Sequence, residues 1–166
     1  MELRALGASG VEVSTIGLGG YELGDGENLA IERVRQIVTT SLDAGVNWFD
    51  TAEVYLDTRN ETAIGEAIAG LRDELLVASK VAPRPDGSGL RPEQVDAACR
   101  ASLQRLRTDR IDVYVVHSPD EDRGVPIAET WGAMAQLVED GLVRAIGLSN
   151  FGIADIEACH TTHTST

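Results

Sequence analysis

Short apolar runs alternate along the chain with longer amphipathic segments. After a hairpin expected over residues 2–13, five runs of four or five residues are typical of strands, and the one over 112–116 is apolar on both faces, as in a covered parallel sheet. Successive runs start about 30 to 37 residues apart, the size of one βα unit. The expected strands cover residues 15–18, 46–49, 75–79, 112–116 and 145–148.

The segments between these runs repeat their apolar positions with the period of a helix. The first helical stripe contains Ile31, Val34, Ile37, Val38 and Leu42. Gly45 is expected to end this helix, and Asn60 to cap the next one. Pro92 and Pro126 suit the first turns of the third and fourth helices, and a fifth helix is expected to begin near residue 152.

Repeated βα units with right-handed crossovers predict an α/β protein. The arrangement is either an open doubly wound sheet or a (β/α)8 barrel, and periodicity alone leaves both open. No interdomain linker interrupts the pattern. We therefore expect one domain over residues 1–158, followed by an irregular tail over residues 159–166.

Composition narrows the classes of partner. The 166 residues carry a formal net charge of −13, with a pI of about 4.5. Such a chain is not expected to bind nucleic acid or anionic membrane surfaces, since both require basic surfaces. No apolar run approaches the ~18 residues of a membrane span, and residues 1–4 do not begin a signal peptide. Cys99 and Cys159 lie far apart, which indicates a reduced, cytoplasmic protein.

Four residues with complementary chemistry lie at or just beyond strand ends, where parallel α/β folds place their sites. They are Asp50, Tyr55, Lys80 and His117. Each alone has an ordinary structural explanation, as a cap, a loop tyrosine, a solvent-facing lysine or a core histidine. Their occurrence on successive strands favours a common site.

Carbonyl reduction requires this set of groups. A ketone or aldehyde that accepts a hydride needs a proton donor at its oxygen, and Tyr55 is expected to be that acid. Lys80 would stabilise the phenolate, and Asp50 would hold Lys80 in place. An N–H of His117 would orient the carbonyl oxygen.

Four segments of the chain resemble motifs of the aldo-keto reductase family. They are residues 45–55, 79–80, 115–119 and 141–151, in the order and spacing of that family. The resemblance implies a (β/α)8 barrel, an NADPH cofactor, a small-molecule carbonyl substrate and the four roles above. It also implies that Gly19, Gly20, Tyr21 and Asp50 border the nicotinamide, and that Ser149 and Asn150 bind its carboxamide.

The chain departs from the family pattern in two places. Leu56 follows Tyr55, where the family usually has glycine. The chain also has only about five βα units, so we expect an incomplete barrel without the last loops that contact the adenine end of the cofactor. An alternative function is therefore an inactive or non-catalytic half-barrel that acts through binding, or through self-association of its exposed sheet edges.

Other nucleotide and metal sites have little support. The chain contains no G-x-G-x-x-G or P-loop motif. Cys159, His160 and His163 lie together near the carboxyl end, but without further ligands they are not expected to form a metal site.

Overall fold

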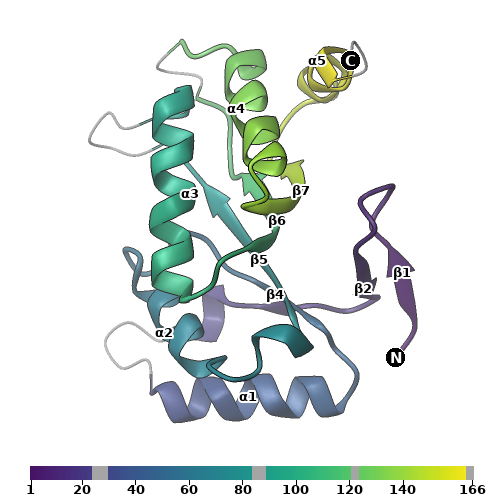
Figure 1. The fold of residues 1–166 in the computed structure, drawn as a ribbon, viewed down its shortest axis with the longest axis vertical. Helices are drawn as coiled ribbons and strands as arrows, with labels where there is room; N and C mark the ends of the chain where they lie inside the picture. The colour runs from purple at the N-terminus through teal and green to yellow at the C-terminus, as the bar shows by residue number, and fades with distance from the viewer. Residues whose placement is uncertain (24–29, 84–88, 121–123, 164–166) are drawn as a thin grey trace.

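Five parallel strands form one sheet in which each strand pairs with its neighbours in the sequence (Figure 1). In this computed structural model the described residues are 1–23, 30–83, 89–120 and 124–163, with side chains described as far as His160. The strands are β1 (Leu3–Ala5), β2 (Glu12–Ser14), β3 (Leu18–Gly19), β4 (Trp48–Asp50), β5 (Leu76–Val81), β6 (Ile111–Val116) and β7 (Val143–Leu148). The helices are η1 (Tyr21–Leu23), α1 (Ile31–Asp43), α2 (Arg59–Ala67), η2 (Arg72–Glu74), α3 (Pro92–Leu106), α4 (Ile127–Glu139) and α5 (Ile153–His163).

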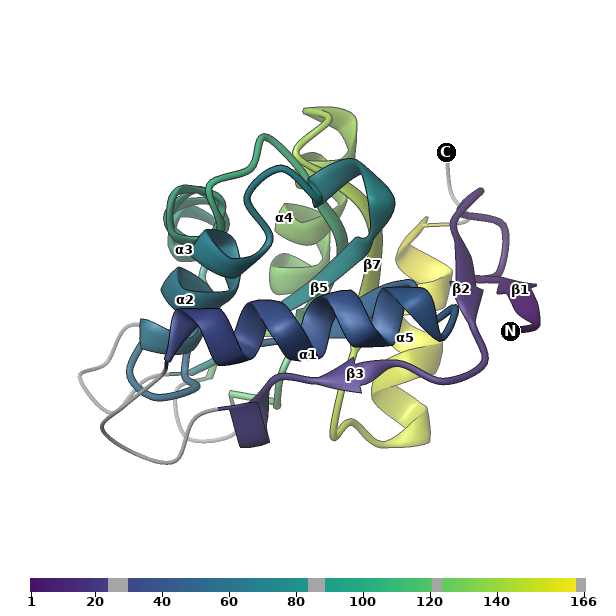
Figure 2. The same ribbon diagram turned by 90° about the horizontal axis from the view of Figure 1, so that it is seen from below.

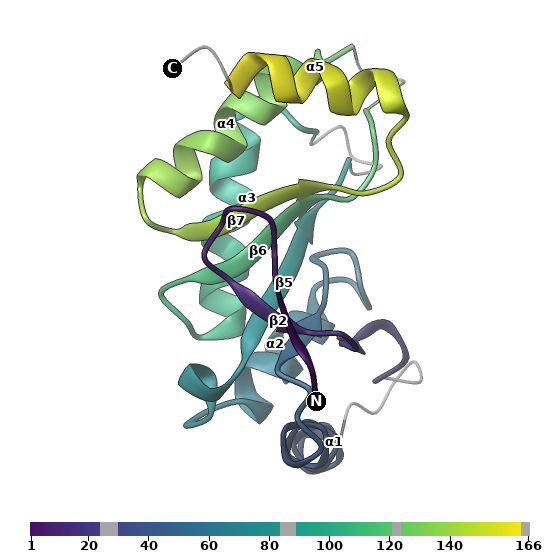
Figure 3. The ribbon, with the colours of Figure 1, turned by 90° about the vertical axis from the view of Figure 1, so that its right-hand side faces the viewer.

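Helices α2 and α3 and the β1–β2 hairpin lie on different sides of this sheet (Figures 1 and 3). Each of the helices α1 to α4 packs against the next one along the chain. Figures 1 and 3 show the β1–β2 hairpin on the side opposite α2 and α3, and Figure 2 shows β3 linking this hairpin to η1. The sheet order β3-β4-β5-β6-β7 follows the sequence, so the carboxyl ends of five consecutive strands lie along one edge.

Local sequence signals set several helix ends. Gly45 follows α1 with φ +84°, and Gly141 follows α4 with φ +74°, left-handed values that favour glycine. Pro92 is the first residue of α3, as expected. The expected cap at Asn60 is wrong, because Thr58 precedes the first residue of α2 and Asn60 lies inside that helix.

Strand ends differ from the predicted ranges by a residue or two at several places, and two boundaries differ by more. The strand expected over 15–18 is β3, which begins only at Leu18, because pairing with β4 starts at the contact of Leu18 with Phe49. The segment from residue 159 was expected to be an irregular tail. Instead α5 continues to His163, while residues 164–166 lie outside the described part of the chain.

The hydrophobic core lies between the sheet and helices α1 to α4. Alternate residues of the central strands face these helices, Val77 and Val81 in β5 and Tyr114 and Val116 in β6. On the other face of β6, Val113 and Val115 are only partly buried, so the expected cover on both faces is incomplete there. Fully or almost fully buried members include Val34, Val38, Phe49, Ile64, Val77, Leu103, Ile111, Tyr114 and Met134. No helix within the described ranges is both long and apolar enough to cross a membrane.

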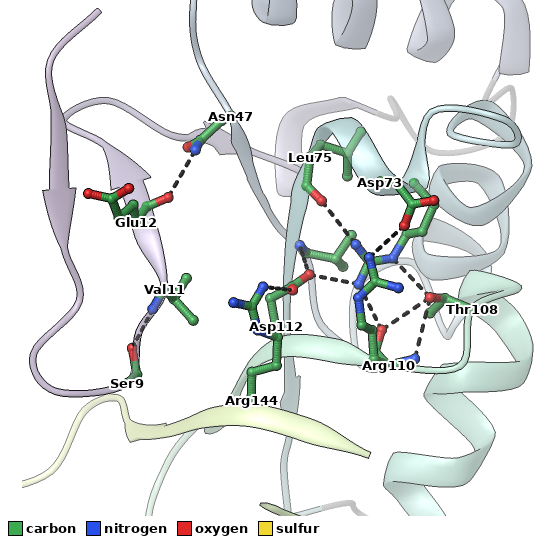
Figure 4. A network of polar contacts seen from close by, with 12 residues as sticks. Ser9, Val11, Glu12, Asn47, Asp73, Leu75, Thr108, Arg110, Asp112 and Arg144 are labelled. Atoms are coloured by element: carbon green, nitrogen blue, oxygen red, sulfur yellow. Dashed lines mark hydrogen bonds and ion pairs between the residues drawn. The ribbon is translucent and has the colours of Figure 1, made fainter. Parts of the chain in front are cut away.

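The amino ends of the strands carry a network of ion pairs and hydrogen bonds (Figure 4). Asp112, fully buried in β6, accepts hydrogen bonds from Arg72 at 2.7 Å, from Arg144 at 3.0 Å and from the Val77 amide at 2.9 Å. Asn47 joins the hairpin to β4 by donating to the Glu12 carbonyl. These contacts stabilise the end of the sheet opposite to the predicted site.

Candidate active site

Lys80 is the centre of the polar cluster at the carboxyl end of the sheet. It lies on β5 with only 7% of its surface exposed. Its ammonium Nζ lies 2.5 Å from Asp50 Oδ1, 2.9 Å from the Thr51 carbonyl oxygen and 3.1 Å from Tyr55 Oη. Three contacts match the three donors of an ammonium group, so the position of Lys80 is well determined. Asp50 neutralises the charge that burial would otherwise make costly.

Tyr55 is held by rings on either side. Its ring centroid lies 5.1 Å from that of Tyr21 and 5.7 Å from that of His117, and both pairs meet edge to face at 76°. Such edge-to-face contacts are favourable for aromatic rings. The half-buried phenol is therefore placed between η1 and the end of β6, with its oxygen near Lys80.

His117 follows β6 and is fixed through its main chain. Its amide donates to the Val81 carbonyl at 2.8 Å, which holds it beside the end of β5. Burial, and then the charge of Lys80, lowers the pKa of His117 below its usual value of 6.5. The imidazole is therefore neutral at pH 7, with one ring N–H available as a donor and one nitrogen as an acceptor.

The residues expected to border a cofactor flank this cluster on both sides. On one side, the amide of Gly20 donates to the Asp50 carbonyl at 2.6 Å, between Gly19 and Tyr21. On the other side, the amide of Ser149 donates to the Val116 carbonyl. Asn150 Nδ2 donates to the His117 carbonyl at 2.8 Å, which links the end of β7 to the cluster.

The structure thus brings all the predicted site residues to one edge of the sheet. Lys80 donates hydrogen bonds to Asp50 and Tyr55, and the ring of Tyr55 meets that of His117. Parallel pairing in sequence order accounts for this, because it places successive strand ends side by side.

Sequence reasoning missed two buried polar residues of α2 that support the site. Asn60, assigned as a cap, donates to the Gly20 carbonyl at 2.8 Å and accepts from the Thr51 hydroxyl at 2.7 Å. Glu61 is fully buried and pairs with Arg105 of α3 at 2.6 Å. Asn60 and Glu61 are adjacent polar residues at the start of α2, which packs against both α1 and α3. Polar residues in such a helix are a signal of buried hydrogen bonds.

Comparison with known proteins decides the family of this fold and cluster. The family model described as the aldo/keto reductase family matches residues 15–166. The chain belongs to the aldo-keto reductase family. An aldo-keto reductase of Mycolicibacterium smegmatis is 40% identical over 145 residues, covering 86% of this chain and 46% of that relative.

Solved aldo-keto reductase structures resemble the fold closely. A thermostable aldo-keto reductase in complex with the inhibitor epalrestat has a TM-score of 0.85 at 33% identity, over 98% of this chain and 58% of that one. An aldo-keto reductase of Klebsiella pneumoniae, in complex with NADP and acetate, has a TM-score of 0.77 at 36% identity, over 89% of this chain and 49% of that one. The chain spans about half the length of its relatives, and its five-stranded sheet corresponds to part of the aldo-keto reductase barrel.

The departure from the family pattern at Leu56 falls at a conformationally demanding position. Leu56, Asp57 and Thr58 have φ angles of +50°, +51° and +68°. Three consecutive residues in the left-handed region are unusual when none of them is glycine. A glycine is easily accommodated at the first of these positions, and this chain uses leucine there instead.

Proposed function

We propose that the chain carries a site for NADPH-dependent reduction of aldehydes or ketones to alcohols, with Tyr55 as the proton donor. The observation that carries this proposal is the placement of Lys80 Nζ, 3.1 Å from Tyr55 Oη and 2.5 Å from Asp50, beside a neutral His117. A phenol supported by an ammonium group, next to a neutral hydrogen-bond donor, suits proton delivery to a carbonyl oxygen.

Each residue has a distinct part in this proposal. The Tyr55 hydroxyl gives its proton to the carbonyl oxygen of the substrate. Lys80 donates to the phenol oxygen and stabilises the negative charge left on it. Asp50 and the Thr51 carbonyl hold the ammonium in that position. His117 orients the substrate by donating a ring N–H to the same carbonyl oxygen.

The residues around this cluster fit the nicotinamide end of a cofactor. A Cβ on Gly19 would meet nothing within 4 Å, so the backbone at the end of β3 borders open space. At Gly20 a Cβ would lie 2.7 Å from the Asp50 carbonyl oxygen, so this position has no room for a side chain. Ser149 and Asn150 supply the hydroxyl and amide groups that suit a carboxamide. Together with Tyr21 and Asp50 these residues would hold the nicotinamide, and NADPH, when bound, supplies the hydride. The NADP complex of the Klebsiella pneumoniae relative supports this choice of cofactor.

The test is NADPH oxidation by the purified chain with a reactive aromatic aldehyde. Tyr55→Phe removes the proton donor and keeps the ring contacts, so kcat should fall by about 10² or more. Tyr114→Phe is the matched control, because it removes a phenol buried behind the sheet, and it should retain the parent rate. Turnover that persists unchanged in Tyr55→Phe contradicts the proposal.

One observation favours a second candidate, a non-catalytic half-barrel that acts through binding or self-association. Within the described part of the chain, β3 and β7 each pair with one strand, so the sheet has two open edges. Sedimentation analysis, which measures the oligomeric state, together with the NADPH assay distinguishes this function from reductase activity. A soluble, folded chain that self-associates and shows no NADPH turnover supports it, whereas a monomer with Tyr55-dependent turnover excludes it.

A further inference from the structure

The pairing of β4 with β5 continues beyond the last residue of β4, into the loop that carries Tyr55. The Thr51 amide donates to the Ala78 carbonyl at 2.8 Å, and the Glu53 amide donates to the Lys80 carbonyl at 3.2 Å. After Lys80, the next amide that faces this loop is that of Ala82, the first residue beyond β5. It donates to the Glu53 side chain, at 3.0 Å from Oε1. A carboxylate thus occupies the place that a main-chain carbonyl would have in a continued ladder.

Because the side chain of Glu53 accepts the Ala82 amide, the main-chain carbonyl of the same residue can accept a hydrogen bond from within the loop. It accepts the Thr58 amide at 3.0 Å and closes the left-handed turn at residues 56–58. Tyr55 lies inside the segment that this bond closes. Glu53 therefore joins two structures through two different oxygens, the end of β5 through its side chain and the loop of Tyr55 through its backbone.

Burial makes this arrangement sensitive to substitution. Glu53 is only 1% exposed, and the Ala82 amide that it accepts is also buried. A buried amide that loses its acceptor is costly unless water replaces it. A cavity of about 240 Å³, bordered by Glu53, Ala82 and Arg105, lies next to this bond and could admit such water. The negative charge of Glu53 also raises the pKa of His117, against the larger effect of burial.

We propose that Glu53 is a positioning residue, whose side chain replaces a backbone acceptor so that the loop can leave the sheet and present Tyr55 to Lys80. This role rests on the proposed reductase function, in which the distance between Tyr55 Oη and Lys80 Nζ matters. Nothing in the proposal requires Glu53 to touch substrate or cofactor.

Three substitutions separate the hydrogen bond from the charge. Glu53→Gln keeps an acceptor oxygen for the Ala82 amide and removes the charge. Glu53→Asp keeps the charge but withdraws the oxygens by one methylene, and Glu53→Ala removes both. We expect kcat for aldehyde reduction within about threefold of the parent in Glu53→Gln, and at least about tenfold lower in the other two, because small misplacements of a reacting group reduce rate strongly.

The Michaelis constant for the aldehyde should change little, since the side chain acts through the main chain of β5 and the loop. Asp57→Asn is the matched control: it removes a carboxylate from an exposed position of the same loop and keeps a residue that tolerates a left-handed φ. It should retain the parent kcat. Loss of kcat in Glu53→Gln equal to that in Glu53→Ala overturns the proposal, because charge would then be the cause.

A structural readout makes the test independent of turnover. Nuclear Overhauser contacts between the Tyr55 ring and the rings of Tyr21 and His117 report the loop position directly. They should persist in Glu53→Gln and weaken in Glu53→Asp, which decides the question even where Glu53→Ala does not fold. Unchanged contacts in Glu53→Asp overturn the proposal. A parent chain without turnover contradicts the reductase function alone, and the ring contacts then decide the role of Glu53.

Discussion

Two glycines within helices should respond to the same substitution with opposite signs. Gly65 lies in the last turn of α2 and Gly132 in the middle of α4. Replacing glycine by alanine in a helix interior gains about 1 kcal/mol of helix propensity. The difference between the two sites therefore comes from what the added methyl group would meet.

At Gly65 the methyl group would collide with the backbone of α3. An ideal Cβ there lies 2.4 Å from the Arg105 carbonyl oxygen and 2.6 Å from the carbonyl carbon and the Cα of Leu106. These backbone atoms cannot rotate away, so the helices must separate, with a cost at or near the upper end of the ~1–3 kcal/mol typical of overpacking. After subtraction of the propensity gain, Gly65→Ala should lower the free energy of unfolding by about 2 kcal/mol.

At Gly132 an added Cβ meets nothing within 4 Å. Only the propensity gain remains, so Gly132→Ala should raise the free energy of unfolding by about 0.5–1 kcal/mol. The two variants should therefore differ by about 3 kcal/mol, which is a substantial fraction of the roughly 5–15 kcal/mol stability of an ordinary domain.

Urea denaturation of the two variants and the parent, followed by circular dichroism, measures this difference. The midpoints should fall on opposite sides of the parent midpoint, with similar slopes. Equal midpoints in the two variants would refute the close approach of α2 and α3 at Gly65. A stabilised Gly65→Ala would do so as well.

Three further predictions concern single side chains. Lys80→Met should lower kcat by about 10² or more, since it removes the ammonium next to Tyr55 Oη, and it should leave a folded chain by circular dichroism; an unchanged kcat contradicts the role of Lys80. Folding lowers the pKa of His117, because the folded protein disfavours the protonated imidazole. The contribution of neutral His117 to the free energy of unfolding is therefore complete above pH 6.5, the unfolded value, and it is lost as the pH falls from 6.5 through the lowered pKa. Urea unfolding of the parent and of His117→Gln between about pH 5 and pH 8 should show that this part of the pH dependence disappears in the variant, and parallel curves would contradict it. Burial, then the charge of Asp96, raises the pKa of Cys99 to about 12, so a disulfide reagent at neutral pH should modify this thiol only after denaturation; rapid modification of the native chain contradicts its burial.

The parallel strands and the residues at their ends were predictable from the sequence pattern. The order of the strands was implied only by the resemblance to the aldo-keto reductase family, because the periodicity also allows an open doubly wound sheet. Apolar runs spaced by one βα unit predict parallel strands, and parallel strands placed in sequence order bring their carboxyl ends to one edge. The proximity of Asp50, Lys80 and His117 follows from that topology alone. The turn at Gly45 and the start of α3 at Pro92 were also predictable, because each depends on the backbone preference of one residue.

Only the tertiary structure decided how these elements are held together. Whether Asn60 caps its helix or bridges Gly20 and Thr51 depends on segments 40 and 9 residues away in sequence. The carboxylate of Glu53 has an acceptor role only because the end of β5 lies beside it, 29 residues along the chain. Local preferences determine where a helix or strand begins. The partners of a buried polar group are set by the packing of distant segments, because burial removes water as the alternative partner.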